Sequence, residues 1–256
     1  MAAWSTLNLM IDVPLIAHRL GREPGPDSSR AALATTLSGF VDGLETDVCL
    51  TADGRLALLH DPWLSSGTTA TGWVHETEWG QLRDARLRDR HGVATMHRPM
   101  LLEDLFRLAP PELRLQIEVK AHGDPDLARA TATAACRVAQ SQAGGREVEI
   151  LSFYTAACEQ AARLGLPARL VVWADYEPDA LIDWAARRGV GGVCVEHFLL
   201  RAELVARLRL GGLSVSTGTI NDVFLARRAA DLGIDAITTD RPAALHRELA
   251  AVKLAA

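Results

Sequence analysis

Short apolar runs alternate along the chain with longer segments whose apolar residues recur at helical spacing. The short runs, which predict strands, lie at residues 15–18, 43–48, 55–60, 113–119, 147–152, 169–173, 191–195, 213–217 and 235–238. The longer segments, which predict helices, lie at residues 28–40, 101–108, 126–140, 156–164, 178–188, 202–208 and 222–232. A strand followed by a helix, repeated this often, is typical of an α/β fold built around a parallel sheet.

The second and third strand candidates are too close together for a helix to connect them. Between them lies Asp53-Gly54, a dipeptide that favours a two-residue hairpin turn. The other strands and the length of 256 residues predict a (β/α)8 barrel with a β-hairpin after its second strand, in one domain over residues 1–256. A doubly wound open sheet is the alternative, although no G-x-G-x-x-G motif follows the first strand to favour it.

In residues 61–100 the apolar residues follow neither the helical spacing nor the alternation of a strand. This stretch therefore forms an irregular insertion after the hairpin. Long loops in compact domains are often functional, so the insertion is either a lid over a site or a structural flap at the barrel end. Its tryptophans, Trp63, Trp73 and Trp79, either line a groove for an acyl chain or pack the flap.

Net charge, cysteine spacing and the lack of long apolar runs indicate the class of protein. The net charge of −5 argues against nucleic acid, because proteins that bind phosphate backbones usually carry a basic face. The cysteines form no C-x-x-C pair, so buried free thiols are expected. We find no signal peptide and no apolar run long enough to span a bilayer, which predicts a cytoplasmic protein without a stable membrane anchor.

Glu45 and Asp47 are two residues apart on the second predicted strand, so their side chains point to the same side. Two inward carboxylates repel each other and resist burial, and a hard cation such as Mg²⁺ or Ca²⁺ resolves that conflict. A solvated strand face is the alternative. If Asp53-Gly54 forms the turn, Asp47 lies opposite His60, which places His60 beside the two carboxylates.

Further polar residues stand at the ends of predicted strands. Glu118 and Lys120 share a face near the C-terminal end of theirs, where barrel enzymes build their active sites. Glu118 is therefore a third candidate metal ligand, with a simple boundary residue as the alternative. His18 and Arg19 end the first strand and suit an acid/base group and a phosphate clamp, although His18 could also be a capping histidine. The other histidines are expected to be structural or solvated: His75, His91, His97, His122, His197 and His246.

Short motifs across nearly the whole chain resemble the glycerophosphodiester phosphodiesterase family. That family has His-Arg-Gly, Pro-Glu-Asn-Thr, Glu-x-Asp-Val, a turn rich in Thr, Asp and Gly, then His-Asp-Pro, Glu-Ile-Lys and a closing strand segment. The matching stretches are His18–Leu20, Pro26–Ser29, Glu45–Val48, Thr51–Gly54, His60–Pro62, Glu118–Lys120 and Gly233–Pro242. The chain departs from the family at Leu20, which replaces Gly, and at Asp27–Ser29, which replaces Glu-Asn-Thr. It departs again at Gly218, which replaces the Trp of a late Trp-Thr-Val-Asn motif.

This resemblance implies a metal-dependent phosphodiesterase on a (β/α)8 barrel. The implied roles are metal ligation by Glu45, Asp47 and Glu118, acid/base catalysis by His18 and His60, and substrate binding by Arg19 and Lys120. The implied reaction hydrolyses a glycerophosphodiester to glycerol 3-phosphate and an alcohol. Its nucleophile is either the adjacent hydroxyl of the substrate or water.

Three other functions fit parts of the pattern. The same chemistry could act on lysophospholipids. A barrel that binds a phosphorylated ligand without turning it over would explain the altered first motif. An unrelated metal-dependent barrel enzyme, such as a lyase, would share the carboxylates but not the hairpin that carries His60. The expected partner is a small phosphodiester, and the oligomeric state stays open.

Overall fold

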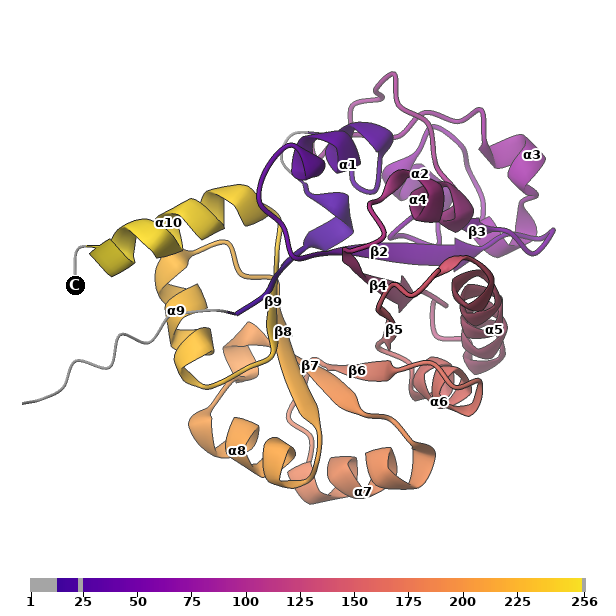
Figure 1. Ribbon diagram of the computed structural model, residues 1–256. Coiled ribbons are helices and arrows are strands. Elements are labelled where there is room, and N and C mark those ends of the chain that lie inside the picture. The colour runs from indigo at the N-terminus through magenta and orange to yellow at the C-terminus, as the bar shows by residue number, and fades with distance from the viewer. Residues whose placement is uncertain (1–12, 23–24, 255–256) are drawn as a thin grey trace, which may run out of the picture.

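Parallel strands close into a barrel in the computed structural model, which describes residues 13–22 and 25–254 (Figure 1). The barrel strands are β1 (Leu15–Ala17), β2 (Gly43–Leu50), β4 (Arg114–Val119), β5 (Val148–Ser152), β6 (Ala168–Val172), β7 (Gly192–Glu196), β8 (Ser214–Gly218) and β9 (Ala236–Thr239). Strand β1 pairs with both β9 and β2, which closes the ring. The predicted (β/α)8 barrel is confirmed, and the open doubly wound sheet is excluded.

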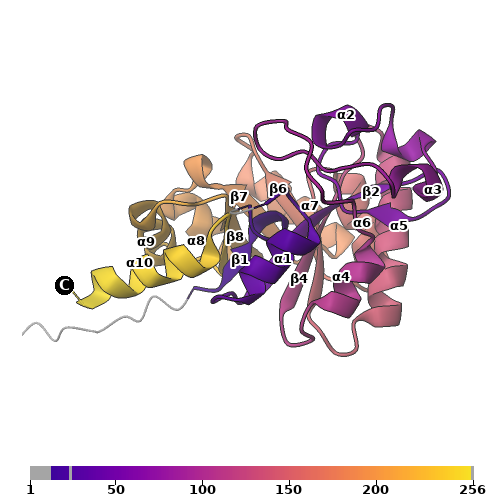
Figure 2. The same ribbon diagram turned by 90° about the horizontal axis from the view of Figure 1, so that it is seen from above.

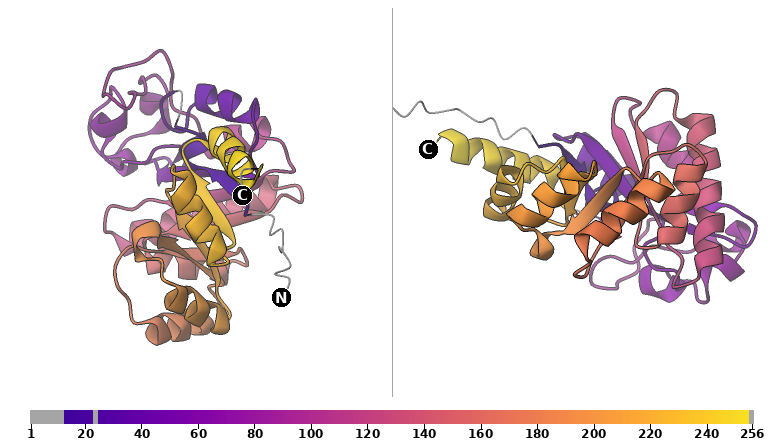
Figure 3. Two further views of the ribbon diagram at one scale, coloured as in Figure 1. Left: turned by 90° about the vertical axis from the view of Figure 1, so that its left-hand side faces the viewer. Right: turned by 90° about the horizontal axis from the view of Figure 1, so that it is seen from below.

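Helices surround the strands on the outside, as Figure 3 shows from two further sides. They are α1 (Arg30–Leu37), α4 (Leu102–Leu108), α5 (Pro125–Gln142), α6 (Thr155–Arg163), α7 (Pro178–Arg188), α8 (Ala202–Leu210), α9 (Val223–Asp231) and α10 (Pro242–Leu254). The pattern of apolar residues had not predicted α10. The side chains of Asp124 and Asp222 accept hydrogen bonds from backbone amides at the starts of α5 and α9, as N-caps do. Among the residues that the structure describes, no helix is both long and apolar enough to cross a membrane.

Strand β4 shows how the barrel separates its two layers of side chains. Leu115, Ile117 and Val119 are fully buried in the main hydrophobic core. Gln116 and Glu118 alternate with them and therefore face the barrel interior. A parallel strand is buried on both faces, so an inward polar residue near its C-terminal end has to find partners among the inward residues of neighbouring strands.

The hairpin after β2 differs from its prediction by one residue. Strand β3 (Leu56–Ala57) pairs antiparallel with β2, and Cys49 lies opposite Ala57. The Thr51 amide donates to the Arg55 carbonyl (2.8 Å), so the loop holds three residues, and Gly54 at its end has a left-handed φ of 77°. The predicted two-residue turn is wrong, and so is the pairing of Asp47 with His60 that depended on it.

The insertion forms a small lobe beside the barrel, next to β2 and β3, as Figures 1 and 2 show. It contains α2 (Leu64–Gly67), the 3-10 turn η2 (Val74–Glu76) and α3 (Trp79–Leu82). Its own hydrophobic cluster is formed by Cys49, Ala57, Leu59, Leu64, Val74, Leu82 and Leu87, with Trp79 packed against it. The rings of Trp63 and Trp73 meet edge to face at 4.9 Å between centroids. Trp79 therefore packs the lobe, while Trp63 and Trp73 contact each other and Trp63 stays 41% exposed.

The cysteines Cys49, Cys136, Cys158 and Cys194 are buried free thiols, as predicted. Burial raises the pKa of Cys158 and of Cys194 to about 12. Both side chains therefore stay in the thiol form at neutral pH, because a thiol ionises only near its pKa.

Candidate active site

Three carboxylates meet inside the barrel mouth, at the C-terminal ends of β2 and β4. Asp47 lies opposite Glu118 in the parallel register, and Glu45 stands two residues before Asp47 on the same face. One oxygen from each residue lies within 4.8 Å of an oxygen from the others. Glu45 and Asp47 are 2% and 1% exposed, and the Glu118 side chain is 13% exposed. Such a set of buried oxygen ligands could hold a hard divalent cation.

Burial makes this cluster costly to ionise. It raises the pKa of Glu45 well above the ordinary value, and the neighbouring charges of Asp47 and Glu118 raise it further. Burial likewise raises the pKa of Glu118, although Lys120 opposes the shift. One oxygen of Glu45, Oε1, is buried without a hydrogen-bond partner within the described ranges. The donor set and this unpaired buried oxygen both fit a bound cation.

Two basic side chains compensate the carboxylates. Lys120 Nζ lies 3.0 Å from Asp47 Oδ1 and also contacts Glu118 Oε1, while Arg19 Nε lies 3.3 Å from Asp47 Oδ2. Burial alone would raise the pKa of Asp47, but Lys120 and Arg19 outweigh it and lower that pKa. The backbone amide of Arg19 also donates to Glu45 Oε2 at 2.8 Å. Both bases therefore offset the negative charge of the carboxylate cluster.

The backbone around Arg19 is unusual because it turns sharply after β1. Arg19 and Leu20 belong to the 3-10 turn η1 (His18–Leu20) and have left-handed φ values of 50° and 64°. Leu20 stands where the His-Arg-Gly motif described above has glycine. The Leu20 side chain is fully buried. Positive φ is costly for a side chain of this size, so the packing around Leu20 must hold the turn in place. The turn directs the Arg19 amide at Glu45.

His18 is held by a carboxylate from the far end of the chain. Its Nδ1 lies 2.7 Å from Oδ1 of Asp240, which directly follows β9. The other oxygen of Asp240 accepts a hydrogen bond of 2.7 Å from Asn221. Burial opposes ionisation of Asp240, but the hydrogen bonds from His18 and Asn221 lower its pKa. Since Nδ1 is engaged, Nε2 is the nitrogen of His18 that remains for a substrate.

His60 reaches the same region by another path. It follows the buried residues Leu58 and Leu59, and its Nδ1 lies 3.1 Å from Oδ1 of Asp61. Burial lowers the pKa of His60, although the nearby charge of Asp47 opposes the shift. The imidazole is therefore neutral at neutral pH, which is the form that accepts a proton.

A cavity of about 370 Å³, the mouth cavity, brings the candidate residues together. It is lined by His18, Arg19, Glu45, His60, Glu118 and Lys120. The rest of its lining consists of Leu151, Phe153, Val171, Cys194, Glu196, His197, Gly218, Thr219 and Thr238. Asp47 is buried beside it and contacts Arg19 and Lys120. All seven residues singled out from the sequence thus lie in one place, while Trp63, Trp73 and Trp79 do not line this cavity.

Some residues of the site had not been assigned a role from the sequence. Asp240 and Asn221 orient His18, and Asp27 accepts a hydrogen bond of 2.7 Å from Arg19 Nη1. Glu196, at the end of β7, faces the mouth cavity opposite the carboxylate cluster. The signal for the first three lay in the matched motifs, because Asp27, Asn221 and Asp240 stand within them. Nothing local distinguishes Glu196 from an ordinary strand-end residue.

Comparison with known proteins settles the family. The model of the glycerophosphoryl diester phosphodiesterase family matches residues 18–244, a range that contains every residue of the site. The chain belongs to this family. The resemblance read from the sequence is therefore confirmed, and the family to which the chain belongs is one of phosphoric diester hydrolases.

Relatives of known name or structure agree with the family membership. The chain is 31% identical over 205 residues to a probable glycerophosphodiester phosphodiesterase 2 of Mycobacterium tuberculosis. This match covers 79% of this chain and 70% of that protein. A phosphodiesterase of Oleispira antarctica, solved in complex with the product sn-glycerol-3-phosphate, is 22% identical with a TM-score of 0.82. The match covers 92% of this chain and 96% of that one. In two other curated relatives, from Sinorhizobium fredii and Bacillus subtilis, the match spans 21% and 44% of the relative's length.

Proposed function

We propose that this protein hydrolyses glycerophosphodiesters to glycerol 3-phosphate and an alcohol, with Mg²⁺ or Ca²⁺ bound by Glu45, Asp47 and Glu118. The observation that carries the proposal is the buried carboxylate cluster beside His18, His60 and the bases Arg19 and Lys120, in a chain of the glycerophosphoryl diester phosphodiesterase family. When bound, the cation supplies Lewis-acid polarisation of the phosphoryl oxygens.

The side chains of the protein supply the remaining steps. Arg19 and Lys120 bind the other phosphate oxygens and stabilise the charge that grows on them. One of the two histidines removes the proton of the nucleophile, and the other protonates the leaving oxygen. Asp240 engages Nδ1 of His18 and fixes the orientation of the ring, so that Nε2 is left to transfer the proton.

Hydrolysis of glycerophosphocholine and of an aryl phosphodiester tests the proposal, with Mg²⁺, Ca²⁺ or EDTA present. We expect metal-dependent turnover that falls by about 10²–10⁴-fold in His18→Ala, because general acid–base groups contribute that much. His97→Ala is the matched control, since His97 is an exposed histidine outside the mouth cavity. It should keep the wild-type rate.

Two other results would contradict the proposal. Metal binding without turnover on a broad panel of diesters would identify a barrel that only binds phosphorylated ligands. Turnover confined to lysophospholipids would assign the same chemistry to lipid substrates. A diester that lacks the hydroxyl adjacent to the phosphate then separates the two nucleophiles, because only direct attack by water would still cleave it.

A further inference from the structure

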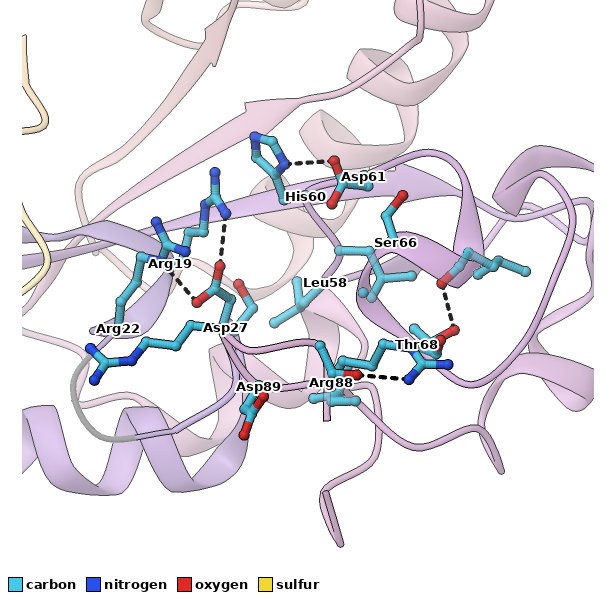
Figure 4. A pocket seen from close by; sticks show the side chains of 17 residues that line it. Arg19, Arg22, Asp27, Leu58, His60, Asp61, Ser66, Thr68, Arg88 and Asp89 are labelled. Carbon is cyan, nitrogen blue, oxygen red and sulfur yellow. Dashed lines mark hydrogen bonds and ion pairs between the residues drawn. The ribbon is translucent and has the colours of Figure 1, made fainter. Parts of the chain in front are cut away.

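A second cavity lies beside the mouth cavity and shares two residues with it. This side pocket, of about 240 Å³, is lined by Arg19 and His60, by Arg22, Asp27 and Ser28, and by residues of the insertion (Figure 4). Arg19 and His60 also line the mouth cavity. The proposed phosphate-binding arginine and one proposed acid/base histidine therefore stand where the two cavities meet.

A phosphodiester has two arms, one on each ester oxygen. If Arg19 binds the phosphate beside His60, one arm enters the mouth cavity and the other enters the side pocket. The mouth cavity is partly apolar, since Leu151, Val171 and Cys194 line its far wall. The side pocket is lined mainly by polar and charged groups, among them Ser66, Thr68 and Arg88. The two arms of the substrate thus meet different chemistry.

The arginines of the side pocket are not all neutralised. Arg22 Nε donates to Asp27 at 2.9 Å, and Arg19 shares the same carboxylate. Arg88, by contrast, donates from Nε and Nη1 to the carbonyls of Thr68 and Gly92, both at 2.8 Å, and Figure 4 shows it beside Thr68. Two neutral carbonyls position this guanidinium without cancelling its charge.

Arg90 adds a second uncompensated charge. Its Nε donates to His91 at 3.3 Å, and within the described ranges neither Arg88 nor Arg90 forms an ion pair with a carboxylate. The two remaining aspartates of the pocket, Asp61 and Asp89, likewise keep their charges, because their partners are neutral. Asp61 bonds His60, while Asp89 accepts the backbone amides of His91 and Val93. Four arginines and three aspartates line the side pocket, which leaves one net positive charge together with the N–H donors of Arg88 and Arg90 that pair with no carboxylate among the described residues.

We propose that the side pocket receives the alcohol arm of the substrate and that Arg88 and Arg90 select alcohols that carry a second phosphate. This inference rests on the proposed hydrolysis. In that reaction the bond between phosphorus and the oxygen of the alcohol arm breaks. Water supplies an oxygen to phosphorus and a proton to the released alcohol, whose second phosphate stays bound to it. A cationic alcohol such as choline is disfavoured, because it would enter a recess of its own charge.

The test compares glycerophosphoglycerol with the same diester phosphorylated on its far glycerol. Wild-type kcat/KM should be at least about ten-fold higher for the phosphorylated diester, since charge-assisted hydrogen bonds to phosphate are strong. In Arg88→Gln and in the Arg88→Gln/Arg90→Gln double variant, this ratio should fall towards one. Arg86→Gln is the matched control, because Arg86 is exposed and does not line the side pocket. It should keep the wild-type ratio.

The products show which arm occupies the side pocket. Two molecules of glycerol phosphate mean that the phosphorylated arm is the one released, as the inference requires. Glycerol together with a glycerol bisphosphate would mean the opposite placement and would overturn it. An unchanged ratio in Arg88→Gln/Arg90→Gln would also overturn it, even if the enzyme hydrolyses every diester.

A binding measurement separates this inference from the proposed function. Calorimetry on His18→Ala, with and without Arg88→Gln, gives the affinity for both diesters in the absence of turnover. Tighter binding of the phosphorylated diester that depends on Arg88 supports the inference even if no diester is hydrolysed. Equal affinity for the two diesters overturns it, whatever the activity.

Discussion

The two halves of the barrel mouth are built from different kinds of residues. On the side of β1, β2 and β4, three carboxylates lie within 4.8 Å of one another and are compensated by Arg19 and Lys120. On the side of β5 to β8, the same cavity is lined by Leu151, Val171, Cys194 and Gly218. Charge is concentrated on one side of the barrel, while the other side supplies a compact and largely apolar wall.

The difference explains how the charged side can work. Electrostatic interactions strengthen where polar surroundings are few, and the apolar side chains opposite the carboxylates offer no polar partner to them. Glu196, His197 and Thr219 are polar residues on this otherwise apolar side. Burial raises the pKa of Glu196, although His197 and His18 oppose the shift. One half of the mouth thus supplies reactive charge, and the other sets the shape and the medium in which that charge acts.

We expect the largest loss of activity when a carboxylate is removed from the charged half of the mouth. Asp47→Asn removes the carboxylate that pairs with both Arg19 and Lys120, so we expect about a 10³-fold loss of metal-dependent hydrolysis. Val171→Ala, its counterpart on the apolar wall, should cost less than about ten-fold. Steady-state kinetics on both variants, with circular dichroism to confirm folding, decide the matter. Equal losses would show that the two halves do not divide the work in this way.

A smaller loss of activity should follow when the carboxylate that holds His18 is removed. Asp240→Asn keeps the shape of the side chain but removes the charge at 2.7 Å from Nδ1, and we expect activity to fall about 10²-fold. The variant should also be less stable at neutral pH by about 1–2 kcal/mol, since a charge-assisted hydrogen bond is lost.

The pH dependence of that stability difference has a definite sign. The pKa of Asp240 is lowered in the folded protein, so its contribution is fully present above the ordinary value of 3.8 and is lost as the pH falls through the lower folded value. Urea unfolding of wild type and Asp240→Asn gives the difference in their free energies of unfolding at pH 7 and at pH 3. We expect the difference to be smaller at pH 3. A difference that grew on acidification would contradict the assignment.

The last prediction concerns the apolar half, where we expect an effect on stability and only a small one on activity. A Cβ on Gly218 would lie 2.8 Å from the Cβ of Thr238, so Gly218→Ala should cost about 1–3 kcal/mol. Gly80→Ala is the control, because Gly80 lies in α3 and its added Cβ would meet nothing within 4 Å. Gly80→Ala should be neutral or stabilising by about 0.4–1 kcal/mol. Thermal unfolding distinguishes the two variants. Equal unfolding midpoints would show that the residues around Gly218 can shift to make room for the added Cβ.

Much of this arrangement could be predicted from residue spacing. Because side chains on a strand alternate, Glu45 and Asp47 had to share a face, and Glu118 had to reach the mouth from the end of its own strand. The hairpin was a different case. Side-chain facing reverses with a shift of one residue, and Gly54 takes the left-handed position of a three-residue loop. His60 reaches the site because the chain after β3 leads there, and not because it pairs with Asp47.

Contacts between distant parts of the chain could not be predicted by spacing. His18 and Asp240 are separated by 222 residues, and nothing near either one specifies the other. The same holds for His75 and His122, which were expected to be structural or solvated and whose ring nitrogens lie 3.2 Å apart. The left-handed turn at Leu20 was also hidden, because leucine rarely adopts positive φ. Only packing from elsewhere in the chain can impose such a conformation.

The pairing of β1 with β9 has a consequence for protein synthesis. During synthesis β1 waits for β9, which is made more than 200 residues later, and His18 waits for Asp240, which follows β9 and lies 222 residues along the chain. A nascent chain that stops before residue 236 keeps one edge of β1 unpaired and leaves that histidine without its carboxylate. A nonsense mutation at any codon before residue 236 therefore yields an open-edged polypeptide that cannot close the barrel, and not a slightly shorter enzyme.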